Sequence, residues 1–115
     1  LILNSSMSHL NESGKGNFWI PVFKIDNLIS QGYLLPPDIV KIDAEGAELE
    51  ILKGMRKCLE HKSVTLLVAL DNRQKREEVF NFLSSLGYKV YDLEEQEIDP
   101  KEIDYTDEII AKKQM

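Results

Sequence analysis

The sequence has little cysteine and little positive charge. Cys58 is the one cysteine among 115 residues, which excludes an internal disulfide and a CxxC metal knuckle and fits a reducing cytoplasm. Lys and Arg number 14 against 20 Asp and Glu, giving a net charge of -6. Because nucleic acid is held by clustered basic residues, a nucleic-acid-binding surface is not expected.

Long hydrophobic runs and targeting signals are also missing. No apolar stretch approaches the roughly 18 residues of a membrane-spanning helix, so no membrane span is expected. The first residues, LILNSSMSHL, lack the basic start and long apolar stretch of a signal peptide. The sequence starts with Leu1 and not with Met, so we expect further residues upstream. With 43% hydrophobic and 30% charged residues, the chain is predicted to be a cytoplasmic globular domain or part of one.

The apolar residues switch between strand and helix periods along the chain. Strands are predicted at 1–3, 18–25, 38–43, 64–70, 88–94 and 107–113, and helices at 26–34, 44–62 and 75–87. Asp26 is expected to cap the first helix, and the continuous apolar strand 64–70 is expected to be buried on both faces. Glu48 and Glu50 are assigned to the solvated side of the second helix.

Strands that alternate with helices predict an α/β fold with a parallel sheet. The last two strands are joined by an acidic linker without a helix, so the final strand is expected to run antiparallel to its neighbours. The predicted architecture is therefore one half of a doubly wound sheet.

Two carboxylates stand where the strand 38–43 meets the following helix. In open α/β sheets, ligands bind beyond the carboxyl ends of the strands, and Asp43 ends this strand while Glu45 follows on the turn. The pair could act as a general base, a divalent-metal ligand or a hydrogen-bond partner for a cation or hydroxyl. It could equally cap the helix amides, a contribution of about 1 kcal/mol. Periodicity alone leaves these alternatives open.

Three further residues are weaker candidates for contacts with a substrate. Asp71 ends the next strand beside the same crevice, where turn chemistry is an alternative explanation. His9 and Ser6 lie in the polar, serine-rich segment that follows the first apolar run.

The segment IVKIDAEGAELEILKGM, preceded by IPVFKIDNLI and followed by LGYKVYDL and DEIIAKK, resembles the C-terminal part of FkbM-type methyltransferases. That family has a Lys-Ile-Asp-x-Glu-Gly-x-Glu block. The block is matched in full by Lys41, Ile42, Asp43, Glu45, Gly46 and Glu48. Ser5 and Ser6 resemble the upstream serine-rich loop of the family, so the similarity covers nearly the whole chain.

The resemblance implies a class I (Rossmann-like) methyltransferase sheet, mostly parallel with an antiparallel last strand. It also implies S-adenosylmethionine as the cofactor and a hydroxyl of a sugar, lipid or natural product as the methyl acceptor. On this interpretation Asp43 is the base or substrate anchor, and Glu45 orients the substrate or holds the turn. Ser6, His9 and Asp71 would contact the substrate, and no metal site is expected.

The chain departs from the family pattern in two places. It lacks the glycine-rich cofactor loop that follows the first strand, so the cofactor-binding residues are expected upstream of Leu1. Residues 1–115 are thus interpreted as a partial methyltransferase domain. At the end of the strand 64–70, Ala69 and Asp71 stand near positions where the family often has Glu and His.

Two other functions compete with the methyltransferase. A flavodoxin-like phosphoacceptor module also places an Asp at a strand end, but the acidic pair and the late lysine that it needs are missing here. A non-catalytic Rossmann-like interaction domain that has lost cofactor binding remains an alternative. Because the first strand of the full sheet is missing, the strand 39–42 is expected to lie at an exposed sheet edge, so that the chain either forms homo-oligomers through this edge or is the ordered part of a longer protein.

Overall fold

The computed structural model describes residues 23–114. The expected strand 1–3 lies outside these residues, as do Ser6, His9 and most of the expected strand 18–25. Ile25, the last residue of that expected strand, already belongs to a helix, so its assignment to a strand was wrong.

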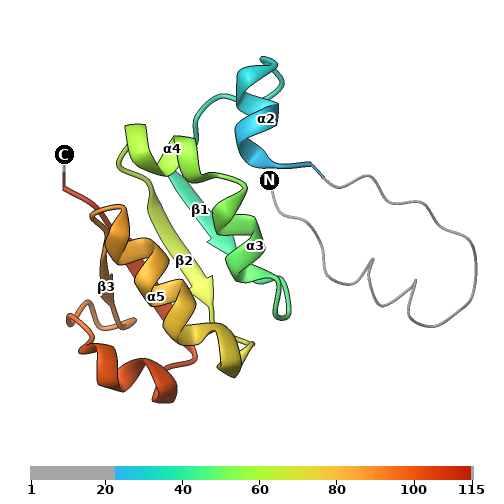
Figure 1. Ribbon diagram of the computed structural model, residues 1–115. Coiled ribbons are helices and arrows are strands. Elements are labelled where there is room, and N and C mark those ends of the chain that lie inside the picture. Colours follow the sequence, from blue (N-terminus) through green and yellow to red (C-terminus); the bar gives the residue numbers. More distant parts are fainter. Residues whose placement is uncertain (1–22, 115) are drawn as a thin grey trace, which may run out of the picture.

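Within the described residues, four strands form one mixed sheet in the order β1-β2-β4-β3 (Figure 1). They are β1 (Ile39–Ile42), β2 (Thr65–Ala69), β3 (Lys89–Tyr91) and β4 (Glu108–Lys112). β1 and β2 are parallel, and β4 runs antiparallel to both β2 and β3. The α/β class and the antiparallel last strand are therefore confirmed, and the last strand is inserted between β2 and β3.

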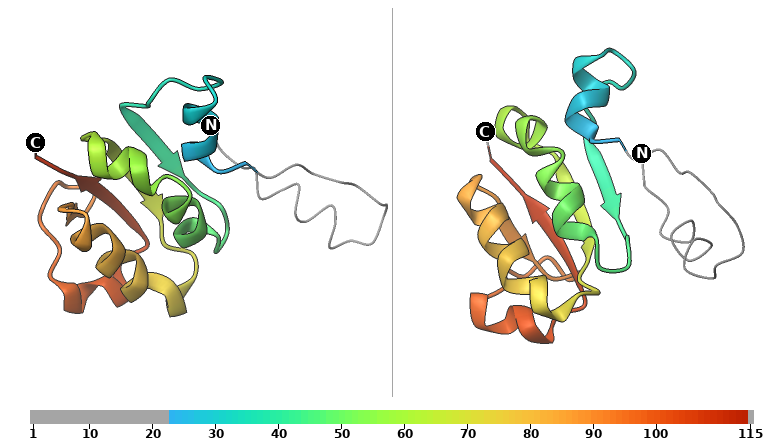
Figure 2. Two further views of the ribbon diagram at one scale, coloured as in Figure 1. Left: turned by 45° about the horizontal axis from the view of Figure 1, so that its top comes forward. Right: turned by 45° about the vertical axis from the view of Figure 1, so that its right-hand side comes forward.

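Within residues 23–114, four α-helices and two short 3₁₀ segments accompany the strands. They are α2 (Ile25–Ser30), α3 (Glu48–Lys53), α4 (Arg56–His61), η1 (Arg73–Lys75), α5 (Arg76–Ser85) and η2 (Pro100–Tyr105). α2 precedes β1, and the others lie between successive strands. Figure 2 shows α3, α4 and α5 on the same side of the sheet. Within residues 23–114, no helix is long and apolar enough to cross a membrane.

The core lies between those three helices and one face of the sheet. The strand side chains that point into it are Val40, Ile42, Leu66, Val68, Val90, Ile109 and Ala111, all buried. On β2 the alternate residues Thr65, Leu67 and Ala69 are only partly buried. The expectation that this strand is buried on both faces was wrong, because the three helices pack on one face only.

The predicted helix 44–62 is divided into α3 and α4, and the cause is a contact with α2. The backbone N–H of Asp26 donates to Gly54 O at 2.9 Å. The Asp26 carboxylate accepts from the N–H groups of Lys57 and Cys58 at 2.8 and 3.0 Å. Asp26 therefore does not cap its own helix, whose N-cap is Lys24, but satisfies the first amides of α4.

Arg76 joins four segments at the end of the sheet where β2 finishes. Its side chain is 3% exposed. The guanidinium donates to Leu70 O at 3.0 Å, to Asp104 O at 2.9 Å and to the Asp107 carboxylate at 3.0 Å. One buried cation thus holds the end of β2, the start of α5, η2 and the start of β4 together, and it satisfies carbonyls that would otherwise lack donors.

We predict that Arg76→Met lowers the free energy of unfolding by about 2–4 kcal/mol, because it removes several charge-assisted hydrogen bonds at a buried position. The exposed Arg73 provides a matched control, and Arg73→Met should change stability by about 0.5 kcal/mol or less. Urea denaturation followed by circular dichroism measures both. Equal effects of the two substitutions would contradict the assignment.

The outer side of β1 is the other notable feature of the sheet. Among residues 23–114, no strand pairs with this side, and the Ile39 side chain is 67% exposed. Lys41 is the only charged residue within the strand. Natural edge strands usually carry more charge, a proline or a bulge that blocks pairing with a second chain.

We predict that the 115-residue chain self-associates through β1, and that Ile39→Lys weakens this association by adding a second charge to a short edge. Leu35 is 86% exposed but lies outside the sheet, so Leu35→Lys is the matched control. Light scattering at several concentrations should show the apparent mass falling for Ile39→Lys alone. A wild-type chain that stays monomeric at every concentration would contradict the prediction.

Candidate active site at the carboxyl ends of β1 and β2

Asp43 and Asp71 follow two neighbouring parallel strands. Asp43 comes directly after β1, and Asp71 follows β2 by two residues. The two strands pair with Ile42 opposite Val68, so both chains leave the sheet at the same edge, the lower end of the β1 and β2 arrows in Figure 1. This is the edge at which open α/β sheets bind their ligands.

The chain turns sharply between β1 and α3, over residues 44–47. The Ala47 N–H donates to Ala44 O at 3.2 Å, and the two central residues, Glu45 and Gly46, have φ angles of 48° and 103°. Positive φ at both central positions is characteristic of a type I′ turn. Glycine adopts it freely, whereas a residue with a side chain loses about 1–2 kcal/mol there. Backbone strain of this kind is concentrated at functional sites.

The buried side chain of Glu48 binds the backbone of this turn. This side chain is 2% exposed, and a single carboxylate oxygen, Oε2, accepts from the N–H groups of Ala44 at 3.2 Å and Gly46 at 2.8 Å. The assignment of Glu48 to the solvated surface was wrong, because two backbone donors satisfy the buried carboxylate. Glu50 is exposed, as expected.

A signal in the sequence could have placed Glu48 correctly. The buried stripe of this region contains Leu52, Met55 and Leu59, and the same spacing of three or four residues, continued backwards, reaches Glu48. A carboxylate on an apolar stripe has to find buried donors.

The carboxyl group of Asp43 lies close enough to that of Asp71 to favour its protonated form, through both its charge and hydrogen bonding. Desolvation raises the pKa of the Asp71 carboxyl above its ordinary value of 3.8, and the negative charges of Glu48, Asp43 and Glu45 raise it further. Like charges that lie close together favour a state in which one carboxyl keeps a proton. The structure therefore brings three of the predicted site residues, Asp43, Glu45 and Asp71, into one electrostatically coupled group.

This arrangement suits proton transfer with a hydroxyl group. Asp43 and Asp71 are both exposed, so a ligand can reach them, and a carboxylate within hydrogen-bonding reach of a hydroxyl can accept its proton. Within the described part of the chain, no group of three or more His, Cys, Asp or Glu side chains is arranged to hold a metal ion.

The surroundings of two other polar residues, Cys58 and His61, indicate structural roles. Burial raises the pKa of the Cys58 thiol, and the negative charge of Asp26 raises it further, so the thiol stays protonated and unreactive. His61 ends α4 and is exposed. Ser6 and His9, the remaining predicted substrate contacts, lie outside the described residues.

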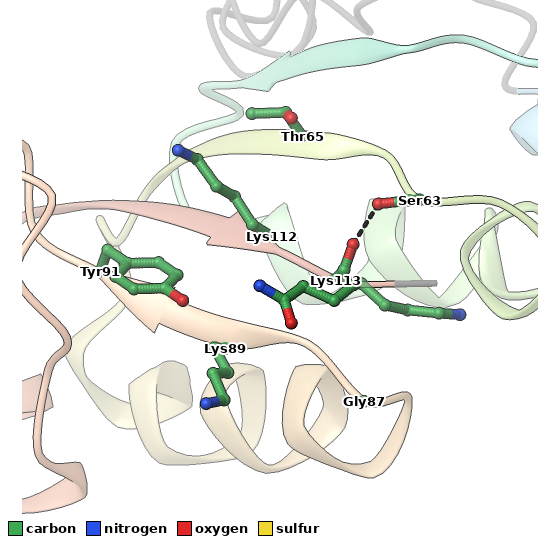
Figure 3. A pocket seen from close by; sticks show the side chains of 8 residues that line it. Ser63, Thr65, Gly87, Lys89, Tyr91, Lys112 and Lys113 are labelled. Carbon is green, nitrogen blue, oxygen red and sulfur yellow. Dashed lines mark hydrogen bonds between the residues drawn. The ribbon is translucent and has the colours of Figure 1, made fainter.

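A hollow of about 280 Å³ lies at the opposite end of the sheet (Figure 3). It is lined by Ser63, Thr65, Gly87, Lys89, Tyr91, Lys112, Lys113 and Gln114. The Lys112 ammonium group lies 3.0 Å from a Glu95 carboxylate oxygen, and the Lys113 ammonium group donates to the carbonyls of Leu59 and Glu60 at the end of α4. Two of the lysines that line the hollow thus already bind other groups of the protein. The acidic group of Asp43, Glu45 and Asp71 is therefore the stronger candidate site.

Comparison with known proteins identifies a family for most of the chain. The profile of the Methyltransferase FkbM domain matches residues 4–90. A 48-residue stretch is 42% identical to the hexuronic acid methyltransferase AglP of Haloferax volcanii, covering 42% of this chain and 20% of that protein. The matched stretch thus spans about a fifth of the length of this curated relative. No solved structure matches the chain.

The raised pKa of Asp71 predicts how stability depends on pH. A carboxyl whose pKa is higher in the folded than in the unfolded state stabilises the fold while protonated, and this contribution is lost as the pH rises through the folded-state pKa. Asp71→Asn, which stays neutral, should therefore raise the melting temperature at about pH 7 and change it little at about pH 3. Thermal melts across this range test the sign.

Glu94, which is exposed in the connection after β3, supplies the control for those melts. Glu94→Gln should not reproduce the pH-dependent gain. A melting temperature of Asp71→Asn that is equal to or below the wild-type value at neutral pH would show that Asp71 is not held in an unfavourable negative environment.

Proposed function

The chain belongs to the FkbM methyltransferase family, and on that premise we propose that it is part of an S-adenosylmethionine-dependent O-methyltransferase that transfers a methyl group to a hydroxyl. The observation that carries this proposal is the position of two carboxyl groups, Asp43 and Asp71, just after the parallel strands β1 and β2 at the carboxyl edge of the sheet. The parallel β1–β2 pair and the antiparallel β4 support the further proposal that the sheet is half of a class I, Rossmann-like fold.

In this proposal Asp43 is the general base. Methylation of a hydroxyl requires that its proton leave, and a positioned carboxylate that accepts it contributes roughly 10²–10⁴-fold to the rate. The proton that arrives on Asp43 is shared with Asp71, whose pKa is already raised by desolvation and neighbouring charges. Glu45 and Asp71 offer further oxygen atoms that hydrogen-bond the acceptor.

S-adenosylmethionine supplies an electrophilic methyl group when it is bound. The described residues do not form a cradle for it. Gly46 is the only glycine of residues 23–114 between a strand and the helix that follows, and its amide is already bonded to Glu48. We therefore assign the acceptor side of the reaction to these residues and the cofactor-binding loop to other parts of the protein.

The proposed acceptor is a hydroxyl group of a sugar, with lipids and other natural products as further candidates. The curated relative is named a hexuronic acid methyltransferase, which supports a carbohydrate. A neutral hydroxyl can donate to the clustered carboxylates of Asp43, Glu45 and Asp71, whereas a negatively charged acceptor group would be repelled by them. The low cysteine content supports a cytoplasmic location.

A non-catalytic interaction domain is the less favoured function. Such a domain has no use for a strained Glu45, held at a φ of 48°, or for a carboxyl pair that raises the pKa of one member. Both features lower stability and are typical of sites that carry out chemistry.

We predict that Asp43→Asn in the full-length protein lowers the rate of methyl transfer by about 10²-fold or more, because asparagine cannot accept a proton. The melting temperature should stay close to the wild-type value, since Asp43 is exposed. Transfer of labelled methyl groups to a panel of neutral sugars and uronic acids measures the rate.

Glu50→Gln is the matched control, because Glu50 is an exposed carboxylate on the neighbouring α3. It should retain full activity. If Asp43→Asn remains active and loses only stability, Asp43 serves the turn and not the reaction.

A further inference from the structure

We infer that Glu48 is a positioning residue, whose buried carboxylate fixes the turn between β1 and α3 and thereby sets the direction in which Asp43 and Glu45 project. The inference deepens the proposed function and rests on it, because it assigns the geometry of that site to a residue outside the reacting group. Glu48 itself does not face the ligand, since its side chain is 2% exposed.

The backbone of the turn is strained and needs support from outside the turn. Glu45 adopts a φ of 48°, a conformation that residues with a side chain avoid. Within the turn, the Ala47 N–H donates to Ala44 O at 3.2 Å. A loop of this kind persists only when its surroundings determine it from several sides.

Glu48 supplies this support through two hydrogen bonds. Its Oε2 atom accepts from the amides of Ala44 and Gly46, the residues that directly follow Asp43 and Glu45. The peptide group after Asp43 and the peptide group after Glu45 are thus both bound to one buried atom. Hydrogen bonds from amides to a carboxylate are roughly twice as strong as those between neutral groups.

The same carboxylate also affects Asp71, just after the end of β2. The negative charge of Glu48 is, after desolvation, the largest cause of the raised pKa of Asp71. Gly46 also lies against Asn72, where an added Cβ would come within 3.7 Å of the Asn72 Cβ. Glu48 therefore affects the ends of both strands. It fixes the backbone next to Asp43, and its charge favours the protonated form of Asp71.

Three substitutions at position 48 separate the contributions of shape, hydrogen bonding and charge. Glu48→Gln keeps an oxygen atom that can accept from both amides but removes the charge. Glu48→Leu fills the site and accepts nothing. Glu48→Asp keeps the charge but draws the carboxylate back by one carbon–carbon bond, so that it cannot reach both amides. Glu50→Leu on the exposed side of α3 is the control.

The first measurement needs no catalysis and uses the 115-residue chain. Hydrogen exchange of the Ala44 and Gly46 amides should accelerate by about 10-fold or more in Glu48→Leu and Glu48→Asp, relative to core amides of β2, because each amide loses its acceptor. In Glu48→Gln their protection should be largely retained. Carbon-13 detection of the Asp71 carboxyl should show its titration midpoint moving down in Glu48→Gln and staying in place in Glu50→Leu.

The second measurement uses the full-length enzyme and normalises activity to the folded fraction. Glu48→Leu and Glu48→Asp should lower kcat by about 10-fold or more with a smaller change in KM, because a misplaced base lowers the rate more than it weakens binding. Glu48→Gln should restore most of kcat. If Glu48→Leu does not fold, Glu48→Asp gives the same comparison.

The outcomes distinguish the two proposals. Wild-type enzyme that transfers no methyl group contradicts the proposed function, while the exchange measurement still tests the hold on the turn. Active wild-type enzyme whose Glu48→Leu and Glu48→Asp variants keep kcat per folded molecule overturns the positioning role. Unchanged exchange at Ala44 and Gly46 overturns it as well.

Discussion

The parallel pairing of β1 and β2 is the interaction on which the candidate site depends. Ile42 is paired with Val68, so the two strands end at one edge, and the residues that follow them meet there. The pairing is stabilised by the burial of Val40, Ile42 and Leu66 under α3, α4 and α5. A shift of one residue in this register would turn the apolar side chains away from the helices and would separate Asp43 from Asp71.

Two buried charged residues fix the backbone just after the paired strands. Glu48 binds the amides of the turn after β1, and Arg76 binds the carbonyl of Leu70 just before Asp71. One strand end is thus fixed by a buried anion that accepts from N–H groups, and the other by a buried cation that donates to C=O groups. Both satisfy backbone atoms of irregular segments that would otherwise lack partners, and both leave the adjacent aspartates exposed to a ligand.

Local patterns were sufficient to predict most of the elements that the structure describes. β-Branched and apolar runs located β1, β2, β3 and β4, because strand formation there follows the side chains that each run carries. The rule that ligands bind at the carboxyl ends of parallel strands brought Asp43 and Asp71 together before their positions were known. The residue motif around Asp43 indicated the family, which the match over residues 4–90 bears out.

The features that were missed arise from contacts between segments far apart in the sequence. The break between α3 and α4 depends on Asp26, which binds amides more than thirty residues away. The burial of Glu48 depends on a turn with positive φ that turns amides toward it. The position of β4 between β2 and β3 depends on pairing that a helix-free linker leaves undetermined. The Asp26 contact and the position of β4 leave no periodic signal within a single element, whereas the spacing of the buried stripe does reach Glu48.

We propose that Asp43 and Asp71 act as one unit on the acceptor hydroxyl. A double-mutant cycle with Asp43→Asn, Asp71→Asn and the combined variant in the full-length enzyme measures their coupling most directly. If the pair acts together, the combined variant should transfer methyl groups about as slowly as the slower single variant. Losses in the two single variants that simply multiply in the combined variant would show that the two carboxyls act independently, and would contradict the account.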